Sequence, residues 1–533
     1  MRKIFLFSSI GVVVAILGLS LLNTTFLWAF VAVGPLLCLG FRDYFQKSQA
    51  IRRNFPLIGR MRYLLEAIRP EIYQYFIESN ADGTPFSREQ RSLVYQRAKK
   101  EVDTLPFGTQ QDVYAPGYEW ISHSLAPSHI DLKEMRVKVG GPLCKHPYNA
   151  SLLNISAMSY GSLSQNAILA LNGAAKDGGF AHNTGEGGLS PYHLEPGGDL
   201  IWQVGTGYFS CRNSDGTFSA EKFRENAAYP QVKMIEIKLS QGAKPSHGGI
   251  LPAKKVTLEI SKIRGVPMGE DVISPPAHSA FSTPIGLLEF VQKLRDLSGG
   301  KPVGFKLCIG KKREFIAICQ AMIRTGITPD YIAVDGGEGG TGAAPLEFSN
   351  NIGTPGIDGL VFVHNALIGF GLRDKIKIFN AGKVTTGFGL IKRLALGADA
   401  VYAARAMMLA LGCIQALRCN TNQCPTGVAT QDPELVAGLV VSNKRVRVAN
   451  YHRGTIVSAC EMIGAMGLEH PSVLRPWHIL KRVSAHEVKN YAEIYQYLKT
   501  GDLVNGKVSE AFRSAMDGAV PESFHNSLER KAA

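Results

Sequence analysis

Short runs of β-branched and aliphatic residues recur through residues 154–403, and each run ends in a glycine-rich or polar cluster. Amphipathic stretches such as 287–297 and 315–325 separate most of them. Strands that alternate with helices predict an α/β fold with a parallel sheet. Eight such units in this length are typical of a (β/α)8 barrel, and an open doubly wound sheet is the alternative. The predicted strands are 154–158, 180–183, 200–204, 234–239, 302–307, 331–334, 377–380 and 399–403.

The segments that follow these strands are rich in glycine and lysine. In a barrel they all open on one face, where barrel enzymes keep their chemistry. Glycine lets backbone N–H groups approach an anion closely, and the loops after the seventh and eighth strands often hold a phosphate. We therefore expect a phosphorylated cofactor. The fingerprint Gly337-x-Gly339-x-x-Gly342 lies in the sixth unit and is followed by no clean helix start, so we interpret it as a barrel loop.

A second feature is the stretch from Ile4 to Phe41, which contains no Asp, Glu, Lys or Arg. A spanning helix needs about 20 apolar residues, and polar residues at 23–25 divide the stretch into spans 4–22 and 26–41. Basic residues flank both ends, which places them on the cytoplasmic side of an inner membrane, together with the catalytic domain. A cleaved signal peptide and a single tilted span are the alternatives.

The chain has 533 residues and a formal net charge of +14, and more than half of that charge lies in residues 1–100. Residues 42–105 predict a basic helical connector that packs on the main domain. The expected partner of this charge is membrane lipid. No nucleic-acid binding is expected, because no basic motif interleaved with aromatic residues occurs in the body of the chain.

Three of the nine cysteines lie together as Cys413-x5-Cys419-x4-Cys424-Pro425. A disulfide framework is not expected in a cytoplasmic domain. Thiolates on one loop bind a soft metal, either zinc or an iron–sulfur cluster. The spacing is wider than the usual zinc pairs and no histidine is near, so an iron–sulfur cluster is favoured.

Six sequence runs occur in an order that resembles the FMN-binding synthase domain of glutamate synthase. They are ISAMSYGSLS, NTGEGG, EIKLSQGAKP, ISPPAH, DGGEGGTGAAPL and ALGCIQALRCNTNQCPTGVATQDPEL. The resemblance covers roughly residues 105–480, and the layout is similar to that of short stand-alone glutamate-synthase-like proteins. It implies a barrel that binds FMN and a [3Fe-4S] cluster. The expected parts are a transmembrane hairpin (1–41), the connector (42–105), the barrel (106–410) and a cluster loop with a helical C-terminal region (411–533).

The resemblance also implies the site residues. The cluster ligands would be Cys413, Cys419 and Cys424. Glu186, Gln241 and Lys244 would form the 2-oxoglutarate pocket, and Lys238 and Lys306 compete to stabilise the reduced flavin ring. The residues expected to hold FMN are Met158, Ser159, Gln203, Lys238, Lys306, Gly337, Gly340, Thr341, Gly382 and Arg405.

The implied reaction reduces a 2-iminoglutarate, formed from 2-oxoglutarate and ammonia, to glutamate. Electrons would pass from the cluster to FMN and then, as a hydride, to the imine. No NAD(P)H domain is recognisable, so the expected electron donor is a ferredoxin or a separate reductase subunit.

The sequence also departs from the family pattern. We expect no glutaminase domain, because the chain begins Met1-Arg2-Lys3, and Ser246-His247 stands where the family usually has Gly-Glu. His247 is either a pocket residue or a surface residue. Two alternatives follow, namely a flavin and iron–sulfur oxidoreductase with another 2-oxo or imino substrate, and a membrane electron-transfer protein.

Overall fold

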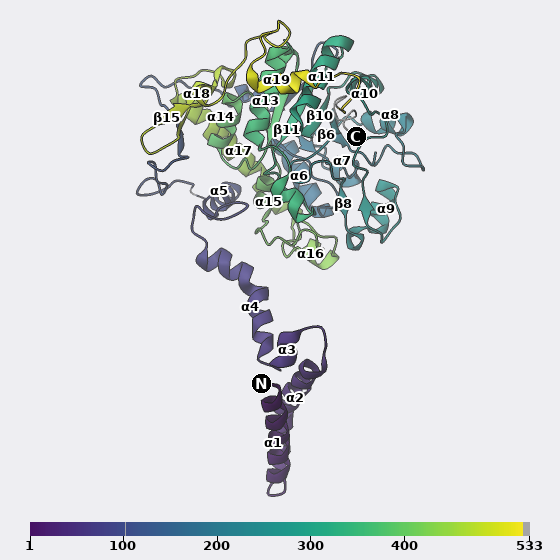
Figure 1. Ribbon diagram of the computed structural model, residues 1–533, viewed down its shortest axis with the longest axis vertical. Helices are drawn as coiled ribbons and strands as arrows, with labels where there is room; N and C mark the ends of the chain where they lie inside the picture. Colours follow the sequence, from purple (N-terminus) through teal and green to yellow (C-terminus); the bar gives the residue numbers. More distant parts are fainter. Residues whose placement is uncertain (102, 526–533) are drawn as a thin grey trace. The chain divides into compact units, whose positions relative to one another are not determined.

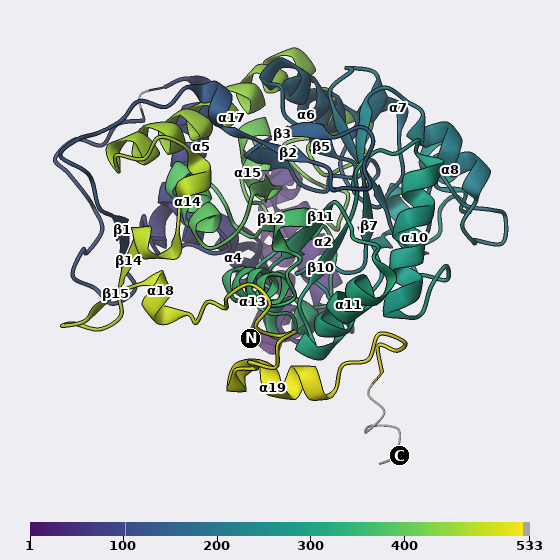
Figure 2. The same ribbon diagram turned by 90° about the horizontal axis from the view of Figure 1, so that it is seen from above.

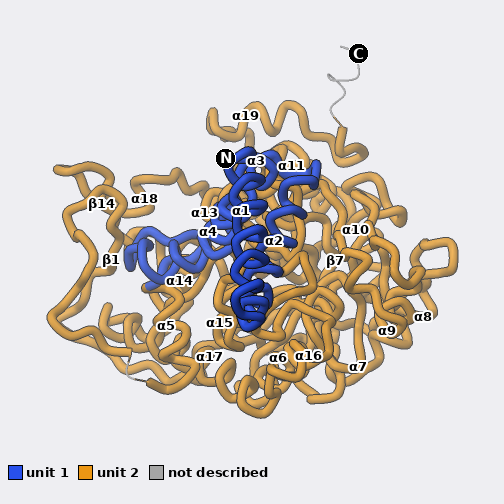
Figure 3. Tube along the Cα trace, turned by 90° about the horizontal axis from the view of Figure 1, so that it is seen from below, with its two compact units in different colours: residues 1–88 blue, residues 89–533 orange. Residues whose placement is uncertain are grey.

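The computed structural model describes residues 1–101 and 103–525 (Figure 1). It divides into two compact units, one of residues 1–88 and one that begins at Glu89 (Figure 3). The two units are described separately below.

The first unit contains two long apolar helices. Helix α1 (Arg2–Ser20) and the helical segment Thr24–Phe45, whose main part is α2 (Ala29–Phe45), are 19 and 22 residues long. Both are long and apolar enough to cross a membrane, by length and composition. The Asn23 side chain accepts the Thr25 backbone N–H at 3.0 Å and so forms the turn between them. The predicted pair of helices is present, and its insertion in a membrane stays a prediction.

Two further helices follow in this unit. Helix α3 (Ala50–Asn54) leads to α4 (Gly59–Ile72), which continues into a π-helical turn at Tyr73–Ile77. The chain predicted as a single connector then enters the second unit through α5 (Arg88–Lys99).

The second unit is built on a closed barrel of eight parallel strands, in the order β4-β5-β6-β7-β10-β11-β12-β13 (Figure 2). The predicted barrel is therefore confirmed, and the open doubly wound sheet is wrong. Every predicted strand overlaps an observed one. The strands are β4 (Leu153–Ile155), β5 (His182–Asn183), β6 (Leu200–Val204), β7 (Val232–Lys238), β10 (Val303–Cys308), β11 (Tyr331–Asp335), β12 (Lys377–Ala381) and β13 (Ala400–Ala403).

The barrel interior changes from apolar to charged along β7. Met234 of β7 belongs to an apolar cluster with Ile201 and Phe379, which also includes Tyr148 of the hairpin β2 (Arg136–Val139) and β3 (Tyr148–Ser151). Alternate residues of a strand face the same side, so Glu236 and Lys238 follow Met234 toward the carboxyl end. The apolar layer stabilises the barrel, and the layers above it are free for chemistry.

Helices cover the outside of the barrel. They include α6 (Gln165–Gly178), α7 (Pro191–Leu194), α8 (Ala220–Ala227), α10 (Pro284–Leu297), α11 (Lys312–Thr325), α12 (Leu346–Asn351), α13 (Gly356–Gly369), α14 (Gly387–Ala395) and α15 (Arg405–Leu411). Between β7 and α10 the chain makes a long excursion that carries β8 (Ile250–Leu251), α9 (Leu258–Arg264) and β9 (Val272–Ile273).

The C-terminal region differs from the predicted helical tail. It begins with α16 (Pro433–Ala437) and the long helix α17 (Val441–Ala465), which packs on α6. It then contributes β14 (Ile479–Arg482) and β15 (Val488–Asn490) to a three-stranded sheet with β1 (Glu119–Ile121), before the short helices α18 (Tyr491–Ile494) and α19 (Glu510–Asp517). Periodicity alone did not indicate these strands, because they are short and half-exposed.

A buried ion pair joins the elements at the amino end of the barrel. Arg295 of α10 and Asp330, just before β11, lie 3.1 Å apart and are each 1% exposed. The Asp330 carboxylate also accepts the backbone N–H groups of Val303 and Gly141. Removal of one partner of such a pair leaves a buried charge uncompensated.

We therefore expect Arg295→Met to lower the free energy of unfolding by about 3–5 kcal/mol. The measurement is the thermal midpoint of circular dichroism for the detergent-solubilised chain. Arg445→Met is the matched control, because the Arg445–Asp177 pair is much more exposed and its loss should cost less than about 1 kcal/mol. Equal shifts for the two variants would contradict this account.

Candidate functional site

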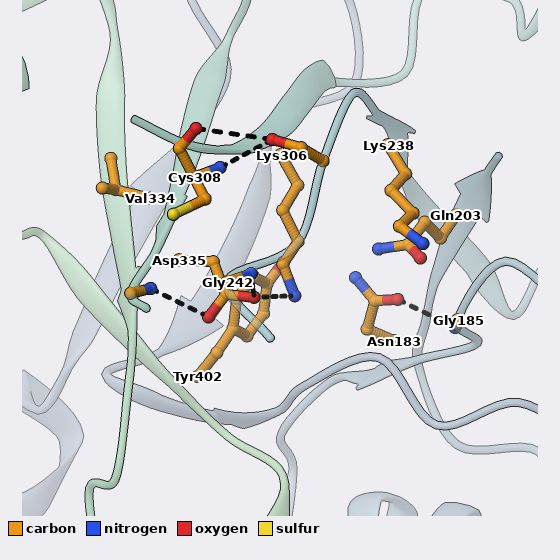
Figure 4. A network of polar contacts seen from close by, with 12 residues as sticks. Asn183, Gly185, Gln203, Lys238, Gly242, Lys306, Cys308, Val334, Asp335 and Tyr402 are labelled. Carbon is orange, nitrogen blue, oxygen red and sulfur yellow. Dashed lines mark hydrogen bonds and ion pairs between the residues drawn. The ribbon is translucent and has the colours of Figure 1, made fainter. Parts of the chain in front are cut away.

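The carboxyl ends of β5, β6, β7 and β10 bring most of the predicted polar residues together in two layers. Gln203 and Glu236 are Cα partners across β6 and β7, and Lys238 and Lys306 are partners across β7 and β10. Partners in adjacent strands face the same side, so each pair lies at one depth in the barrel. The inner layer is Gln203 with Glu236, and the outer layer is the two lysines. Figure 4 shows Gln203 and both lysines.

The inner layer is a fully buried network centred on Glu236. Its carboxylate accepts hydrogen bonds from Asn183 Nδ2 at 2.8 Å, Gln203 Nε2 at 2.7 Å and the Tyr402 hydroxyl at 2.9 Å. Burial raises the pKa of Glu236 despite these donors. The network fixes the Gln203 side chain. The sequence analysis predicted Gln203 and missed Glu236, although Glu236 stands two residues before Lys238 on the same face of the strand.

The outer layer holds two buried lysines that are paired with different carboxylates. Lys238 Nζ lies 2.5 Å from Glu186 Oε1, and Lys306 Nζ lies 3.2 Å from Asp335 Oδ2. Burial opposes the charge of Lys306, but Asp335 and Glu236 raise its pKa. The Lys306 amino group points to Asp335 in Figure 4. Both lysines that compete for the flavin role are therefore present at the same level of the barrel.

Glu186 is the carboxylate on which several cations converge. Burial alone would raise its pKa, but the charges of Lys238, Lys244 and Arg264 hold that pKa below its usual value. Gly249 lies against this side chain, because a Cβ atom there would stand 2.6 Å from Glu186 Oε1. The ionised form of Glu186 is thus favoured. The structure brings together Glu186, Lys238 and Lys244 as the sequence predicts.

Two buried cations in this cluster lack a carboxylate partner of their own. Lys244 is 2% exposed and donates to the Ala343 carbonyl at 2.8 Å, while Arg264 is 5% exposed and donates to the Tyr160 carbonyl at 3.0 Å. Neither forms an ion pair with any described residue. Burial lowers the pKa of Lys244 to about 8 and that of Arg264 to about 10, and Glu186 opposes both shifts. The site therefore carries a surplus of positive charge.

The sequence analysis missed Arg264. It lies at the end of α9, in the excursion after β7, and no motif marks it. The spacing could have indicated it, because Arg264 stands four residues after Ile260, on the same face of the helix. The structure shows that both residues are buried. A charged residue at a position where the helical period predicts an apolar one indicates either a buried ion pair or a ligand.

Two further polar groups lie near the cluster. Gln241 Nε2 is buried and has no hydrogen-bond partner among the described residues, which fits a ligand acceptor at this point. His278, which was also missed, binds the Lys238 carbonyl through Nε2 at 2.9 Å and the Tyr208 hydroxyl through Nδ1 at 3.0 Å. Burial lowers the pKa of His278 to about 4, so it is a neutral support for the loop.

A second group of cations lies at the ends of β12 and β13, where a phosphate is expected. Lys383, Arg393 and Arg405 have pKa values lowered by burial, and the Glu338 carboxylate opposes the shift at all three. Asp335 also opposes the shift at Arg405, and Glu119 opposes it at Arg393. Arg405 lies directly over Gly340, where a Cβ atom would be 2.7 Å from Arg405 Cδ. Gly382 has a φ of 138°, a conformation that favours glycine.

These residues fit the phosphate of an FMN molecule by charge and by the close approach that glycine allows. Of the predicted set, Gly340, Gly382 and Arg405 lie in this group, and Lys383, Arg393 and Glu338 were missed. The Gly337 N–H donates to the Thr354 carbonyl at 2.8 Å, and Thr341 is exposed. Met158 and Ser159 follow β4, where the Met158 carbonyl accepts His193 Nε2 at 3.1 Å.

The three predicted cluster ligands share one folded loop after α15. The Gln415 N–H donates to Cys413 Sγ at 3.4 Å. Burial would raise the pKa of Cys424, but the Thr426 hydroxyl and the backbone N–H groups of Ala429, Thr426 and Val428 lower it. Such donors suit a thiolate ligand. Among the described residues, no three His, Cys, Asp or Glu side chains are grouped to hold a metal ion, so the cluster stays a prediction.

A buried lysine stands beside this loop and was missed from the sequence. Lys255 is 2% exposed and donates to the carbonyls of Ser162 at 2.9 Å and Ala429 at 2.8 Å. Burial lowers its pKa to about 8, whereas Cys419 and Cys424 raise it. The lysine ties the excursion after β7 to the cysteine loop and places a positive charge near two thiols.

His247 lies on the same excursion, three residues after Lys244. Its Nδ1 atom is 3.0 Å from the Gly248 carbonyl, and its ring meets the Phe348 ring edge-on at 5.2 Å between centroids. It is half-buried. The contacts explain its orientation and assign it no role in the site.

Comparison with known proteins adds the family. The conserved region of glutamate synthase matches residues 126–469 of this chain. A glutamate synthase large subunit-like protein, YerD of Bacillus subtilis, is 38% identical over 484 residues, which are 83% of this chain and 91% of that protein.

Two further relatives match over a shorter region. An archaeal-type glutamate synthase [NADPH] of Thermotoga neapolitana is 37% identical over 334 residues, 62% of each chain. An archaeal glutamate synthase [NADPH] of Methanocaldococcus jannaschii is 39% identical over 323 residues, 60% of each chain. The chain thus spans about three fifths of the length of these two relatives.

The closed barrel with its buried cationic site defines an α/β-barrel enzyme, and the relatives make it an oxidoreductase that acts on CH–NH2 donors. The chain belongs to the glutamate synthase family.

Proposed function

We propose that the protein catalyses the reductive amination of 2-oxoglutarate with ammonia to give glutamate, with FMN and a [3Fe-4S] cluster as cofactors. The ammonia is free or comes from a separate protein. The observation that carries the proposal is the surplus of buried positive charge at Lys244 and Arg264. A ligand with two carboxylates satisfies both cations, and 2-oxoglutarate has two.

The ionised Glu186 is suited to the amination step. Protonation of the hydroxyl group of the ammonia–ketone adduct and loss of water give an iminium cation, and a carboxylate within reach stabilises that positive charge. Glu186 remains ionised because Lys238 lies 2.5 Å away. The water-poor surroundings of the cluster strengthen the electrostatic attraction between Glu186 and the iminium.

FMN would be held at its phosphate by Gly340, Gly382, Arg393 and Arg405, and at its ring system by Gln203, Lys238 and Lys306. When bound, it would supply the hydride for the imine. The cluster would be held by Cys413, Cys419 and Cys424, and it would supply electrons one at a time from a ferredoxin or a separate reductase subunit.

We also propose that the first unit anchors the protein in the cytoplasmic membrane, with the catalytic unit on the cytoplasmic side. The length and composition of α1 and of Thr24–Phe45 support this, together with the basic residues on both flanks.

The function is tested by reoxidation of the chemically reduced, detergent-solubilised chain under anaerobic conditions. The flavin absorbance should recover only when 2-oxoglutarate and ammonium are both present, and glutamate should form in equal amount. Reoxidation by another 2-oxo acid at the same rate would indicate a different substrate. Recovery without either compound would point to an electron-transfer protein.

The binding of 2-oxoglutarate should depend on the protonation of Lys244. Because its pKa is about 8 in the free site, the cation is present below that pH and lost above it. Above pH 8 we expect the Kd for 2-oxoglutarate to rise by up to about tenfold per pH unit, since binding must then take up a proton. Lys244→Met should weaken binding and remove this pH dependence.

Isothermal titration calorimetry of the oxidised holoprotein with 2-oxoglutarate measures the Kd at each pH. Lys262→Met is the matched control, because Lys262 is an exposed lysine of α9. It should leave the affinity and its pH profile unchanged. A pH profile that persists in Lys244→Met would assign the titration to another group.

Replacement of one cysteine should remove the cluster and leave the flavin. We expect Cys419→Ser to lose the iron and sulfide of the purified chain but to retain FMN, because the proposed phosphate site lies on other loops. Iron analysis, acid-released flavin and electron paramagnetic resonance measure both cofactors. Cys144→Ser is the control and should keep its iron; full iron content in Cys419→Ser would rule out the ligand assignment.

A further inference from the structure

Helix α4 carries an apolar stripe that no other part of the first unit covers. Met61, Leu64, Leu65, Ile68 and Ile72 are spaced so that they share one face of the helix. The first four side chains are 55%, 54%, 53% and 40% exposed, and only Gly59 of the whole helix is buried. Phe76, one turn further on, is 85% exposed. A contiguous exposed apolar surface of this kind marks a site of interaction.

The sequence analysis expected this region to pack on the main domain. A helix that is apolar on one face and carries arginine beside that face is instead typical of a segment that lies in the plane of a membrane surface. Arg62 and Arg69 are seven residues apart and follow the same edge of the stripe.

The start of α4 is fixed to the end of α2. Arg60, in the first turn of α4, forms two hydrogen bonds of 2.7 Å with the carboxylate of Asp43, which is near the end of α2 and 1% exposed. The Leu57 N–H donates to the same carboxylate at 3.3 Å. Gly59 leaves no space for a side chain, since a Cβ atom would stand 2.9 Å from the Ile51 carbonyl oxygen.

These contacts lock the corner from α2 through α3 to α4 (Figure 1). If α2 crosses a membrane, its last turn lies at the level of the lipid headgroups, and the first turn of α4 lies at the same level. At 1.5 Å per residue, α4 then runs about 21 Å from that point. Its apolar stripe is long enough to lie along the boundary between headgroups and acyl chains.

The charges of this segment favour an anionic surface. Arg42, Lys47, Arg52, Arg53, Arg60, Arg62 and Arg69 are opposed in residues 42–69 only by Asp43 and Glu66. Arg60 is occupied by Asp43, and Arg69 lies 4.0 Å from Glu66. Arg62 is exposed.

We infer that α4 lies on the cytoplasmic leaflet, with its apolar stripe among the acyl chains and its arginines bound to anionic phospholipid headgroups. This rests on the proposed anchor. The first unit then has two roles. Helices α1 and α2 anchor the chain in the membrane, and α4 binds more strongly to a leaflet that contains anionic lipid.

The test is photo-crosslinking of the full chain in vesicles. A benzoylphenylalanine is placed singly at Leu65 on the stripe, at Ala67 on the other side of α4, or at Val14, which is 62% exposed on α1. The vesicles are of phosphatidylcholine, with or without phosphatidylglycerol. After irradiation, mass spectrometry identifies lipid and peptide adducts.

We expect lipid adducts from Leu65 and far fewer from Ala67. The yield at Leu65 should increase with phosphatidylglycerol. Arg62→Gln and Arg69→Gln should each reduce that gain, by up to about fivefold in the surface-bound equilibrium. Equal lipid yields at Leu65 and Ala67, or adducts of Leu65 to peptides of residues 89–533, would overturn the inference.

The crosslinker at Val14 distinguishes failure of the membrane anchor from failure of the role of α4. Lipid adducts from Val14 without any from Leu65 would leave the anchor in place and reject the role of α4. Absence of lipid adducts at both positions would reject the anchor and the inference together.

Discussion

The site depends on buried cations that outnumber the carboxylate near them, since Glu186 faces Lys238, Lys244 and Arg264. In the second group Glu338 faces the buried Arg393 and the more accessible Lys383 and Arg405. Burial of a charge without an opposite charge is unfavourable, and burial lowers the pKa values of Lys244, Arg264, Lys383, Arg393 and Arg405. An anion that enters either place relieves that cost, which supports the proposal of a dicarboxylate at one and a phosphate at the other.

Closure of the barrel is what makes this arrangement possible. Lys238 and Lys306 are distant in sequence and become neighbours because β7 and β10 are parallel and in register. The apolar layer below, with Met234 and Tyr331, excludes water from the base of the site. The low dielectric constant there strengthens each ion pair above it, and burial in the same surroundings lowers the pKa values of Lys244 and His278.

The barrel and the motif residues of the site could be predicted from the sequence. The strands were predictable because their periodic runs end in conspicuous loops. The motif residues lie at the end of such a strand (Lys238) or in the loop that follows one (Glu186 and Lys244). Arg264, Arg393 and Lys255 were not predictable in the same way. Each lies in or beside a helix outside the motifs, and each reaches the site only through the path of the excursion after β7 or the packing of α14. Strands β14 and β15 could not be predicted either, because short, half-exposed strands show little alternation of apolar and polar residues.

The net charge of +14 therefore has two distinct physical meanings in this chain. In the second unit a few cations, such as Lys244 and Arg264, are buried. Little solvent screens them, so each one attracts a small anion strongly. In the first unit the arginines are exposed or half-buried, so solvent screens each one, and only several acting together on an anionic surface give appreciable attraction. The Asp43–Arg60 pair is an exception in the first unit, because its carboxylate is buried. It removes one arginine from the set proposed to bind lipid, and it fixes the first turn of α4 to the end of α2.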